Sequence, residues 1–279
     1  MVSDLQRKGE AFKALHDRDG IFVMANPWDR GSALLLEAAG FEALATTSAG
    51  SNYANGTTDW DYHIPREEMI RQFGDIAQCV DVPMNGDLEN GYGDSPEDVA
   101  ETIRQSIAAG MVGGGIEDYT GDAANPLYDL GLATERIAAA REAADASGIP
   151  FVLTGRAECY LAGVDNAFEK SVERLNAYRE AGADVLYAPG PQSLEEISAL
   201  VREVDGPMNF VIGRRDTTLT VAELDEAGVK RISIGGALFR ACYGYLHDAG
   251  VELLQQGTFD WTKSVIDGKI LNSVLLRLR

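Results

Sequence analysis

Short apolar stretches recur along the chain, and each ends in small or polar residues before a helical stretch begins. Because these stretches are apolar on both faces, they are typical of strands that are buried on both sides of a sheet. Segments of helical length separate them, so strands and helices alternate. The predicted strands are residues 21–25, 41–46, 82–87, 112–117, 151–154, 183–187, 208–212 and 229–234.

The junctions between these elements carry helix-end signals. Several predicted helices end in Ala-Gly directly before a strand, as at Gly110 and Gly182, and glycine there adopts the left-handed C-cap conformation at no steric cost. Ser95-Pro96 is typical of a helix start, with an N-cap serine and a proline in the first turn. Ser193 and Thr220 each precede a glutamate by three residues, which predicts two capping boxes.

Eight strand–helix units in a chain of 279 residues predict an α/β fold, a (β/α)8 TIM barrel. An open doubly wound sheet also alternates strands and helices, but the count of eight and the absence of a linker favour the barrel. We therefore expect a single domain over residues 1–279. Residues 258–279 form a mixed apolar tail, which indicates docking or subunit exchange rather than a free end.

Composition narrows the class of protein. The formal net charge is −20, which argues against nucleic acid and anionic membrane surfaces as partners. The 45% of hydrophobic residues is ordinary for a globular chain, and no apolar run is long enough to span a membrane. The N-terminus lacks an apolar signal core, and the cysteines Cys79, Cys159 and Cys242 show no paired metal spacing. We expect a soluble, reduced, cytoplasmic protein.

The most informative polar stretch is Asp87-Leu88-Glu89, where a predicted strand ends. Active sites of such barrels lie at the carboxyl ends of the strands, and residues two apart on a strand face the same way. Glu117 follows the next strand, so three carboxylates converge. Converging carboxylates repel one another and favour a hard cation with oxygen ligands, Mg²⁺ above all, with Mn²⁺ as an alternative. A solvated acidic loop is the plainer interpretation.

Arg156 is an unusual cation after an apolar strand. A guanidinium there can bind a substrate carboxylate or phosphonate bidentately; alternatively it forms structural ion pairs with Glu158 or Glu117. Further polar residues are expected at or near the strand ends and join the candidate site: Ser48, Gly50, Asp59, Asn209 and Ser233.

In combination and order, several segments make the chain similar to one family. They are Asn26-Pro27-Trp28-Asp29, Thr47-Ser48-Ala49-Gly50, residues 86–93, Gly115-Ile116-Glu117-Asp118, Gly155-Arg156-Ala157-Glu158 and residues 228–233. On these segments the chain resembles the isocitrate lyase and phosphoenolpyruvate mutase superfamily over nearly its whole length.

The resemblance implies Mg²⁺ held largely through water near Asp87, with Glu89 and Glu117 around it. It implies that an α-keto or α-hydroxy carboxylate chelates the metal and that Arg156 grips its carboxylate. It also implies that Ser48 and the amides around Ala49 and Gly50 hold the other substrate oxygens, and Asp59 matches an acid of the family loop. From their places on strands seven and eight, Asn209 and Ser233 are also expected to bind substrate. We expect Glu117, Arg156 and Asp59 to be the catalytic residues. It also implies a last helix packed on a neighbouring subunit, usually within a homotetramer, or otherwise a dimer.

The chain departs from the family in the stretch after strand four. Isocitrate and methylisocitrate lyases carry Lys-Lys-Cys-Gly-His there, whereas residues 119–128 contain no Cys, Lys or His. This indicates a divergent branch. Residues 120–129 are predicted to form a lid over the barrel mouth, with Asp122 and Tyr128 as its plausible proton-transfer groups.

These features predict a Mg²⁺-dependent enzyme that cleaves or forms a C–C bond beside an enolate of a small α-keto or α-hydroxy carboxylate. One alternative is P–C chemistry, as a phosphonomutase or phosphonopyruvate hydrolase. Another is a barrel that binds an α-keto acid without turnover.

Overall fold

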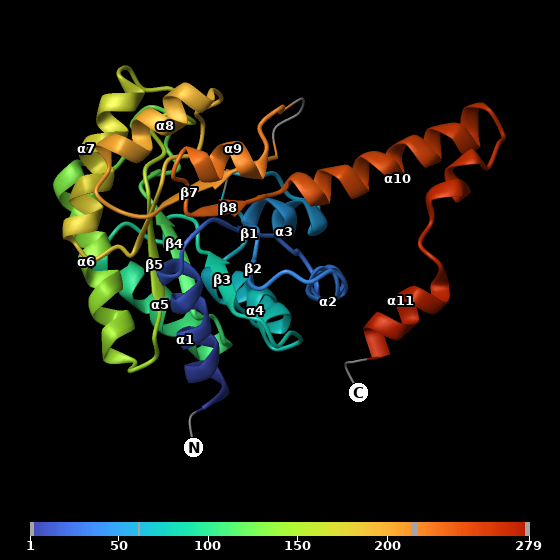
Figure 1. Ribbon diagram of the computed structural model, residues 1–279, viewed down its shortest axis with the longest axis horizontal. Coiled ribbons are helices and arrows are strands. Elements are labelled where there is room, and N and C mark those ends of the chain that lie inside the picture. Colours follow the sequence, from blue (N-terminus) through green and yellow to red (C-terminus); the bar gives the residue numbers. More distant parts are fainter. Residues whose placement is uncertain (1–2, 61, 214–216, 277–279) are drawn as a thin grey trace.

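In the computed structural model, which describes residues 3–60, 62–213 and 217–276, eight parallel strands form one sheet that curls into a barrel (Figure 1). The strand order is β1-β8-β7-β6-β5-β4-β3-β2, and a bridge between Ala25 and Leu44 joins its two edges. The strands are β1 Phe22–Met24, β2 Leu44–Ala45, β3 Met84–Asp87, β4 Gly113–Glu117, β5 Val152–Arg156, β6 Val185–Tyr187, β7 Met208–Val211 and β8 Arg231–Ser233. The predicted TIM barrel is thereby confirmed. Every predicted strand is present, seven of them in a shorter form, whereas β5 extends two residues beyond its predicted end, to Arg156.

Helices surround the barrel and alternate with the strands (Figure 1). The strands they separate are buried on nearly every residue, as expected of a sheet covered by helices. The helices are α1 Asp4–Asp17, α2 Arg30–Ala38, α3 Ser48–Ala54, α4 Arg66–Ala77, α5 Pro96–Ala109, α6 Leu130–Ala146, α7 Ala167–Glu180, α8 Leu194–Glu203, α9 Val221–Glu226, α10 Ala237–Gln255 and α11 Gly268–Leu275, with a 3-10 turn η1 at Asp260–Ser264.

The predicted helix ends are mostly as the sequence indicates. The Ser95 side chain caps α5, and Gly110 ends that helix with a φ of 108°. Thr220 and Glu223 form the expected capping box at α9. At α8 the Ser193 side chain accepts from the Glu196 amide, and the reciprocal contact of a capping box is not formed.

Glycines on β4 determine where side chains fill the interior of the barrel and where space remains. A Cβ at Gly113 would lie 2.6 Å from the Phe12 ring of α1, so glycine lets this helix close the amino end of the barrel. A Cβ at Gly115 would meet only the Thr154 Cβ, at an ordinary 3.8 Å. Space is therefore left inside the barrel above Phe12, at the level of Gly115.

The C-terminal segment departs from the barrel. Helix α10 extends outward from β8, and α11 turns back to lie against α2 (Figure 1). Of the α10 side chains only Phe239 is buried, and apolar side chains including Leu246, Leu254 and Phe259 are exposed. None of the helices within the described residues combines the length and apolar character that crossing a bilayer requires.

Candidate functional site

A cavity of about 400 Å³ opens at the carboxyl ends of the strands. The start of α3 together with Asp59, Trp60 and Tyr62 forms its rim, and the ends of β3, β4 and β5 form its base. Most of the residues predicted to form the site line this one cavity: Ser48, Ala49, Asp59, Asp87, Glu89, Glu117 and Arg156. We call it the mouth cavity.

Asp87, the last residue of β3, is held from two sides. The backbone amide and the hydroxyl of Ser48 both donate to its Oδ2, each at 2.8 Å. Arg156 Nη1 donates to its Oδ1 at 3.2 Å. These contacts fix the orientation of the carboxylate, because both of its oxygens accept hydrogen bonds from groups on rigid elements.

Arg156 makes ion pairs with three carboxylates in the structure. Its Nη2 lies 3.1 Å from Glu117 Oε2 and its Nε 2.5 Å from Glu158 Oε1, in addition to the contact with Asp87. Burial works against the charged form, but these acids raise the pKa of Arg156 well above its ordinary value. The Tyr187 ring covers the guanidinium, with its centroid 5.0 Å away. The contacts of Arg156 in this structure are therefore those of the alternative interpretation, in which it forms ion pairs with Glu158 and Glu117.

The mouth cavity carries an excess of acid. Glu89 is buried, and the nearest donor to its Oε1 is Asn52 Nδ2 at 3.4 Å, whereas its Oε2 has no partner within the described residues. Burial, together with Glu117 and Asp87, raises the pKa of Glu89 to about 9. Burial also raises the pKa of Glu158 to about 8. The pKa values of Glu117 and Asp59 are raised, again chiefly by burial.

This donor set fits a hard cation that is bound partly through water. Within the described residues no three acidic, histidine or cysteine side chains stand close enough to bind an ion directly. The carboxylates of Asp87, Glu89 and Glu117 nevertheless line the same cavity, and the orphaned Glu89 oxygen lacks a counter-charge. A hydrated divalent cation would supply that charge, and Mg²⁺ usually keeps several waters in protein sites.

Tyr62 is a site residue that the sequence did not reveal. Its hydroxyl donates to Glu117 Oε1 at 2.8 Å, and both residues line the mouth cavity. Tyr62 and Trp60 have φ values of 46° and 75°, in the left-handed region that is strained for such residues. Since the segment has no regular hydrophobic period, no sequence signal marks the tyrosine.

Two groups of residues that were expected at the rim lie outside the two cavities described here. Gly50 lines neither cavity, and its amide donates to Thr47 Oγ1 at 3.2 Å as part of the helix cap. No residue of the predicted lid, 120–129, lines either cavity. The Tyr128 hydroxyl donates to Asp94 Oδ1 at 2.6 Å, away from the mouth. Trp60 and Tyr62 line the mouth cavity instead, and Gly121 of the predicted lid lies beside the Tyr62 ring.

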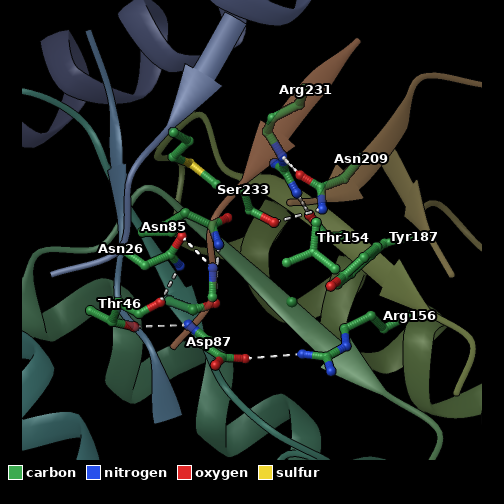
Figure 2. A pocket seen from close by; sticks show the side chains of 16 residues that line it. Asn26, Thr46, Asn85, Asp87, Thr154, Arg156, Tyr187, Asn209, Arg231 and Ser233 are labelled. Atoms are coloured by element: carbon green, nitrogen blue, oxygen red, sulfur yellow. Dashed lines mark hydrogen bonds and ion pairs between the residues drawn. The ribbon is translucent and has the colours of Figure 1, made fainter. Parts of the chain in front are cut away.

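A second, smaller cavity of about 60 Å³ lies inside the barrel and shares Asp87, Arg156 and Tyr187 with the mouth cavity. Asn209 and Ser233 line this deeper space, and Asn209 Nδ2 donates to Ser233 Oγ at 3.0 Å. Arg231 lies beside them, and Figure 2 shows these groups at one end of the cavity and Asp87 and Arg156 at the other. We call it the floor cavity. Asn209 and Ser233 therefore line the floor cavity at the end opposite Asp87, and they do not line the mouth cavity.

Comparisons with known proteins agree with this geometry. The family model described as phosphoenolpyruvate phosphomutase matches residues 12–254. Oxaloacetate decarboxylase of Paraburkholderia xenovorans is 30% identical over 87% of this chain and 80% of its own. A lyase/mutase-type protein of Burkholderia cenocepacia is 47% identical, with a TM-score of 0.95 over 98% of both chains. The structure of 2,3-dimethylmalate lyase, of the PEP mutase/isocitrate lyase superfamily, is 26% identical, with a TM-score of 0.83 over 99% of this chain and 95% of its own.

Proposed function

Since the chain belongs to the phosphoenolpyruvate phosphomutase family, within the PEP mutase/isocitrate lyase superfamily of lyases and mutases, we propose that it is a Mg²⁺-dependent carbon–carbon lyase. Its substrate is a small α-keto or α-hydroxy carboxylate, and the bond that breaks or forms lies beside an enolate. The observation that carries the proposal is the mouth cavity, where Ser48 and Arg156 orient Asp87 among further buried acids.

Asp87, Glu89 and Glu117 are the residues that would hold the metal. Bound there, Mg²⁺ would supply Lewis-acid polarisation of the substrate's keto or hydroxyl oxygen, which stabilises an enolate. Mn²⁺ prefers similar oxygen ligands and is expected to substitute.

Arg156 has two roles in this proposal. Its three ion pairs hold Asp87, Glu117 and Glu158 in place, and its guanidinium forms one wall of the cavity in which a substrate carboxylate would lie. A carboxylate entering the site competes with Asp87 and Glu117 for the Nη donors. A cation that draws these two acids toward itself would release those donors to the substrate, which links metal binding to carboxylate binding.

Glu117 and Asp59 are the proposed wall acids for proton transfer, because both line the cavity and burial raises the pKa values of both. A raised pKa brings a carboxyl group closer to the condition in which it can both take up and give a proton at the working pH. Tyr62 fixes Glu117 by the hydrogen bond to its Oε1. Trp60 and Tyr62 line the same cavity as Glu117 and Asp59. Their aromatic side chains would help to exclude water from an enolate bound there.

P–C bond chemistry is the second candidate, because the matching family model is that of a phosphomutase. A phosphonate would present an anion of the kind that a guanidinium binds, as would a carboxylate. The choice between the two depends on which substrates are turned over.

The C-terminal segment, residues 258–279, is proposed to pack on a neighbouring subunit of a homodimer or homotetramer. Although α11 lies against α2 of the same chain, Phe259, Ile266 and Ile270 of this segment are exposed. Helix α10, which leads into the segment, projects from the barrel with exposed Leu246 and Leu254. A monomer rarely exposes large apolar patches to water. Deleting residues 258–279 should therefore dissociate or aggregate the protein in light scattering. A monodisperse, active monomer would contradict the assignment.

The function is tested with a panel of α-keto, α-hydroxy and phosphono acids in the presence of Mg²⁺, with pyruvate and phosphate as the detected products. Release of pyruvate from a C–C substrate supports the lyase. Release of phosphate from phosphonopyruvate supports the second candidate. Binding of the acids in a thermal-shift assay without turnover of any of them would contradict both.

A further inference from the structure

Arg231 is a buried cation for which the proposed reaction has no use. It is 2% exposed and lies on β8 inside the barrel. Its Nε donates to Asn209 Oδ1 at 2.8 Å, and its Nη2 donates to Thr154 Oγ1 at 3.0 Å on the strand across the barrel. Its Nη1 lies 3.3 Å from His16 Nε2. Each of these partners is a neutral group, since burial lowers the pKa of His16 to about 3.

The charge of Arg231 is not balanced by the groups around it. Among the described residues no carboxylate forms an ion pair with Arg231, although Arg156 has three such partners. Burial lowers the pKa of Arg231 to about 9, so the group still carries its charge at neutral pH. A buried charge without a counter-charge is costly. A guanidinium has five N–H groups, and the contacts above use three of them.

Arg136 shows how this fold accommodates a buried arginine that has only a structural role. It is 1% exposed, and its Nη atoms donate to the backbone carbonyls of Asn90, Gly93 and Asp94. Its guanidinium also lies 4.1 Å from the centroid of the Tyr128 ring. The gap beside it has a volume of about 0 Å³, which is too small for a water molecule. Three backbone carbonyls and an aromatic face therefore contact the Arg136 guanidinium, and Asp94 and Asp98 lie near enough to favour its charged form.

Arg231 differs because open space lies next to it. The floor cavity of about 60 Å³ is lined by Arg231, Ser233 and Asn209, and on the opposite wall by Gly115, which contributes no side chain. A single water molecule needs a cavity of roughly 10–15 Å³, so the floor cavity accommodates a group of several heavy atoms. The cavity also adjoins the mouth at Asp87 and Arg156 (Figure 2).

We propose that the floor cavity is an anion-binding subsite, in which Arg231 and Ser233 bind a single negatively charged group of about carboxylate size. Two sources can supply such a group. One is the distal carboxylate of a dicarboxylate substrate whose reacting end lies in the mouth, and this source rests on the proposed function. The other is a free inorganic monoanion such as chloride, which requires no assumption about the reaction.

The substrate source is tested by calorimetry with two matched α-hydroxy acids, lactate with one carboxylate and malate with two. In the wild-type protein with Mg²⁺, malate should bind more tightly than lactate. Arg231→Gln should weaken malate binding on the order of 30-fold, since charge-assisted hydrogen bonds are lost, and leave lactate binding within about threefold. Lys230→Gln is the control, because this neighbouring cation on the outer side of the barrel contacts only the carbonyls of Arg18 and Gly20.

The inorganic source is tested with the wild-type protein alone, by crystals grown in sodium bromide and a map of bromine anomalous scattering. A peak beside Arg231 and Ser233 supports the subsite whether or not any substrate is turned over. Gly115→Ala gives a second variant that keeps Arg231, since its added methyl group would enter the cavity at 3.8 Å from the Thr154 Cβ. It should lower the occupancy of bromide and the affinity for malate severalfold.

The outcomes distinguish the two sources of the anion from each other, and they also show whether the subsite exists. Loss of malate preference in Arg231→Gln identifies the substrate carboxylate, and a bromide peak with unchanged malate preference identifies a free anion. The proposal is wrong if no bromide peak appears and neither Arg231→Gln nor Gly115→Ala changes the preference for malate over lactate. Arg231 would then have only a structural role, in which it holds Asn209 and Thr154. Should Arg231→Gln fail to fold, the bromide map and Gly115→Ala decide.

Discussion

Arg156, where the mouth cavity meets the floor cavity, and Arg231, deep in the floor cavity, lie in opposite environments. Arg156 at the mouth is paired with Asp87, Glu117 and Glu158. Arg231 at the floor contacts the neutral side chains of Asn209 and Thr154. Under the proposed function a cation would balance the acids of the mouth, and under the proposed subsite an anion would balance the charge of Arg231 at the floor. A substrate with a chelating end and an anionic end would satisfy both.

The largest effect is expected from Asp87→Ala, which removes the acid on which Ser48 and Arg156 converge. Turnover should fall by several orders of magnitude and the stabilisation of the protein by Mg²⁺ should shrink. Rates with excess Mg²⁺ and thermal shifts in the presence and absence of Mg²⁺ check this. Turnover at the wild-type rate in excess chelator would remove the metal from the mechanism.

The next effect concerns the arginine of the mouth. Arg156→Lys keeps the charge but loses the fork that contacts Asp87, Glu117 and Glu158 together, so the change is not conservative. We expect a loss on the order of a hundredfold in kcat/KM. Steady-state kinetics measure it. Kinetics that equal those of the wild type would show that Arg156 only supports the structure.

The acid excess of the mouth also predicts how stability depends on pH. The pKa values of Glu89 and Glu158 are about 9 and about 8 in the folded protein, above the ordinary 4.5 of an unfolded chain. At a pH between the unfolded and the folded pKa of each group, the folded state binds more protons than the unfolded state. The free energy of unfolding therefore falls as the pH rises from about 5 toward 9. The slope is up to about 1.4 kcal/mol per pH unit for each proton.

Under the proposed function, Mg²⁺ held near Asp87 and Glu89 would replace the proton of Glu89 as a counter-charge. Thermal unfolding from pH 5 to 9 should therefore show a steep decline in Tm in chelator and a flatter one with Mg²⁺. Glu89→Gln should reduce the decline in chelator. Identical pH profiles with and without Mg²⁺ would mean that the cation is not bound among these acids.

The smallest effect is expected from Tyr62→Phe, which deletes only the hydroxyl that donates to Glu117. A neutral donor to a carboxylate contributes about 1–2 kcal/mol, so kcat should fall on the order of tenfold with KM little changed. Tyr128→Phe is the matched control, because its hydroxyl bonds Asp94 outside the mouth. Equal losses in the two variants would indicate a general effect on folding.

The sequence predicted the barrel and its acids because those features depend on local patterns. Strand and helix periodicity and cap residues such as Ser95 are legible along the chain. Asp87 and Glu89 sit at a strand end in sequence, and the barrel geometry then places them with Glu117.

The parts that the sequence missed depend on contacts across the barrel. Tyr62 reaches Glu117 from an irregular segment, and whether Tyr128 faces the mouth or Asp94 is decided by packing of a loop. Arg231 did leave a signal, since it is a cation within the apolar stretch 229–234. Its lack of a carboxylate partner became visible only when Asn209 and Thr154 were placed around it.

The most direct measurement is the affinity for oxalate, a stable planar mimic of an α-keto acid enolate, by calorimetry with Mg²⁺ and with chelator. If the mouth binds keto acids through a cation held near Asp87, oxalate should bind in the presence of Mg²⁺, at least a hundredfold less tightly in chelator, and not detectably in Asp87→Ala. Equal affinity in Mg²⁺ and chelator, or unchanged affinity in Asp87→Ala, would contradict a cation-dependent mouth.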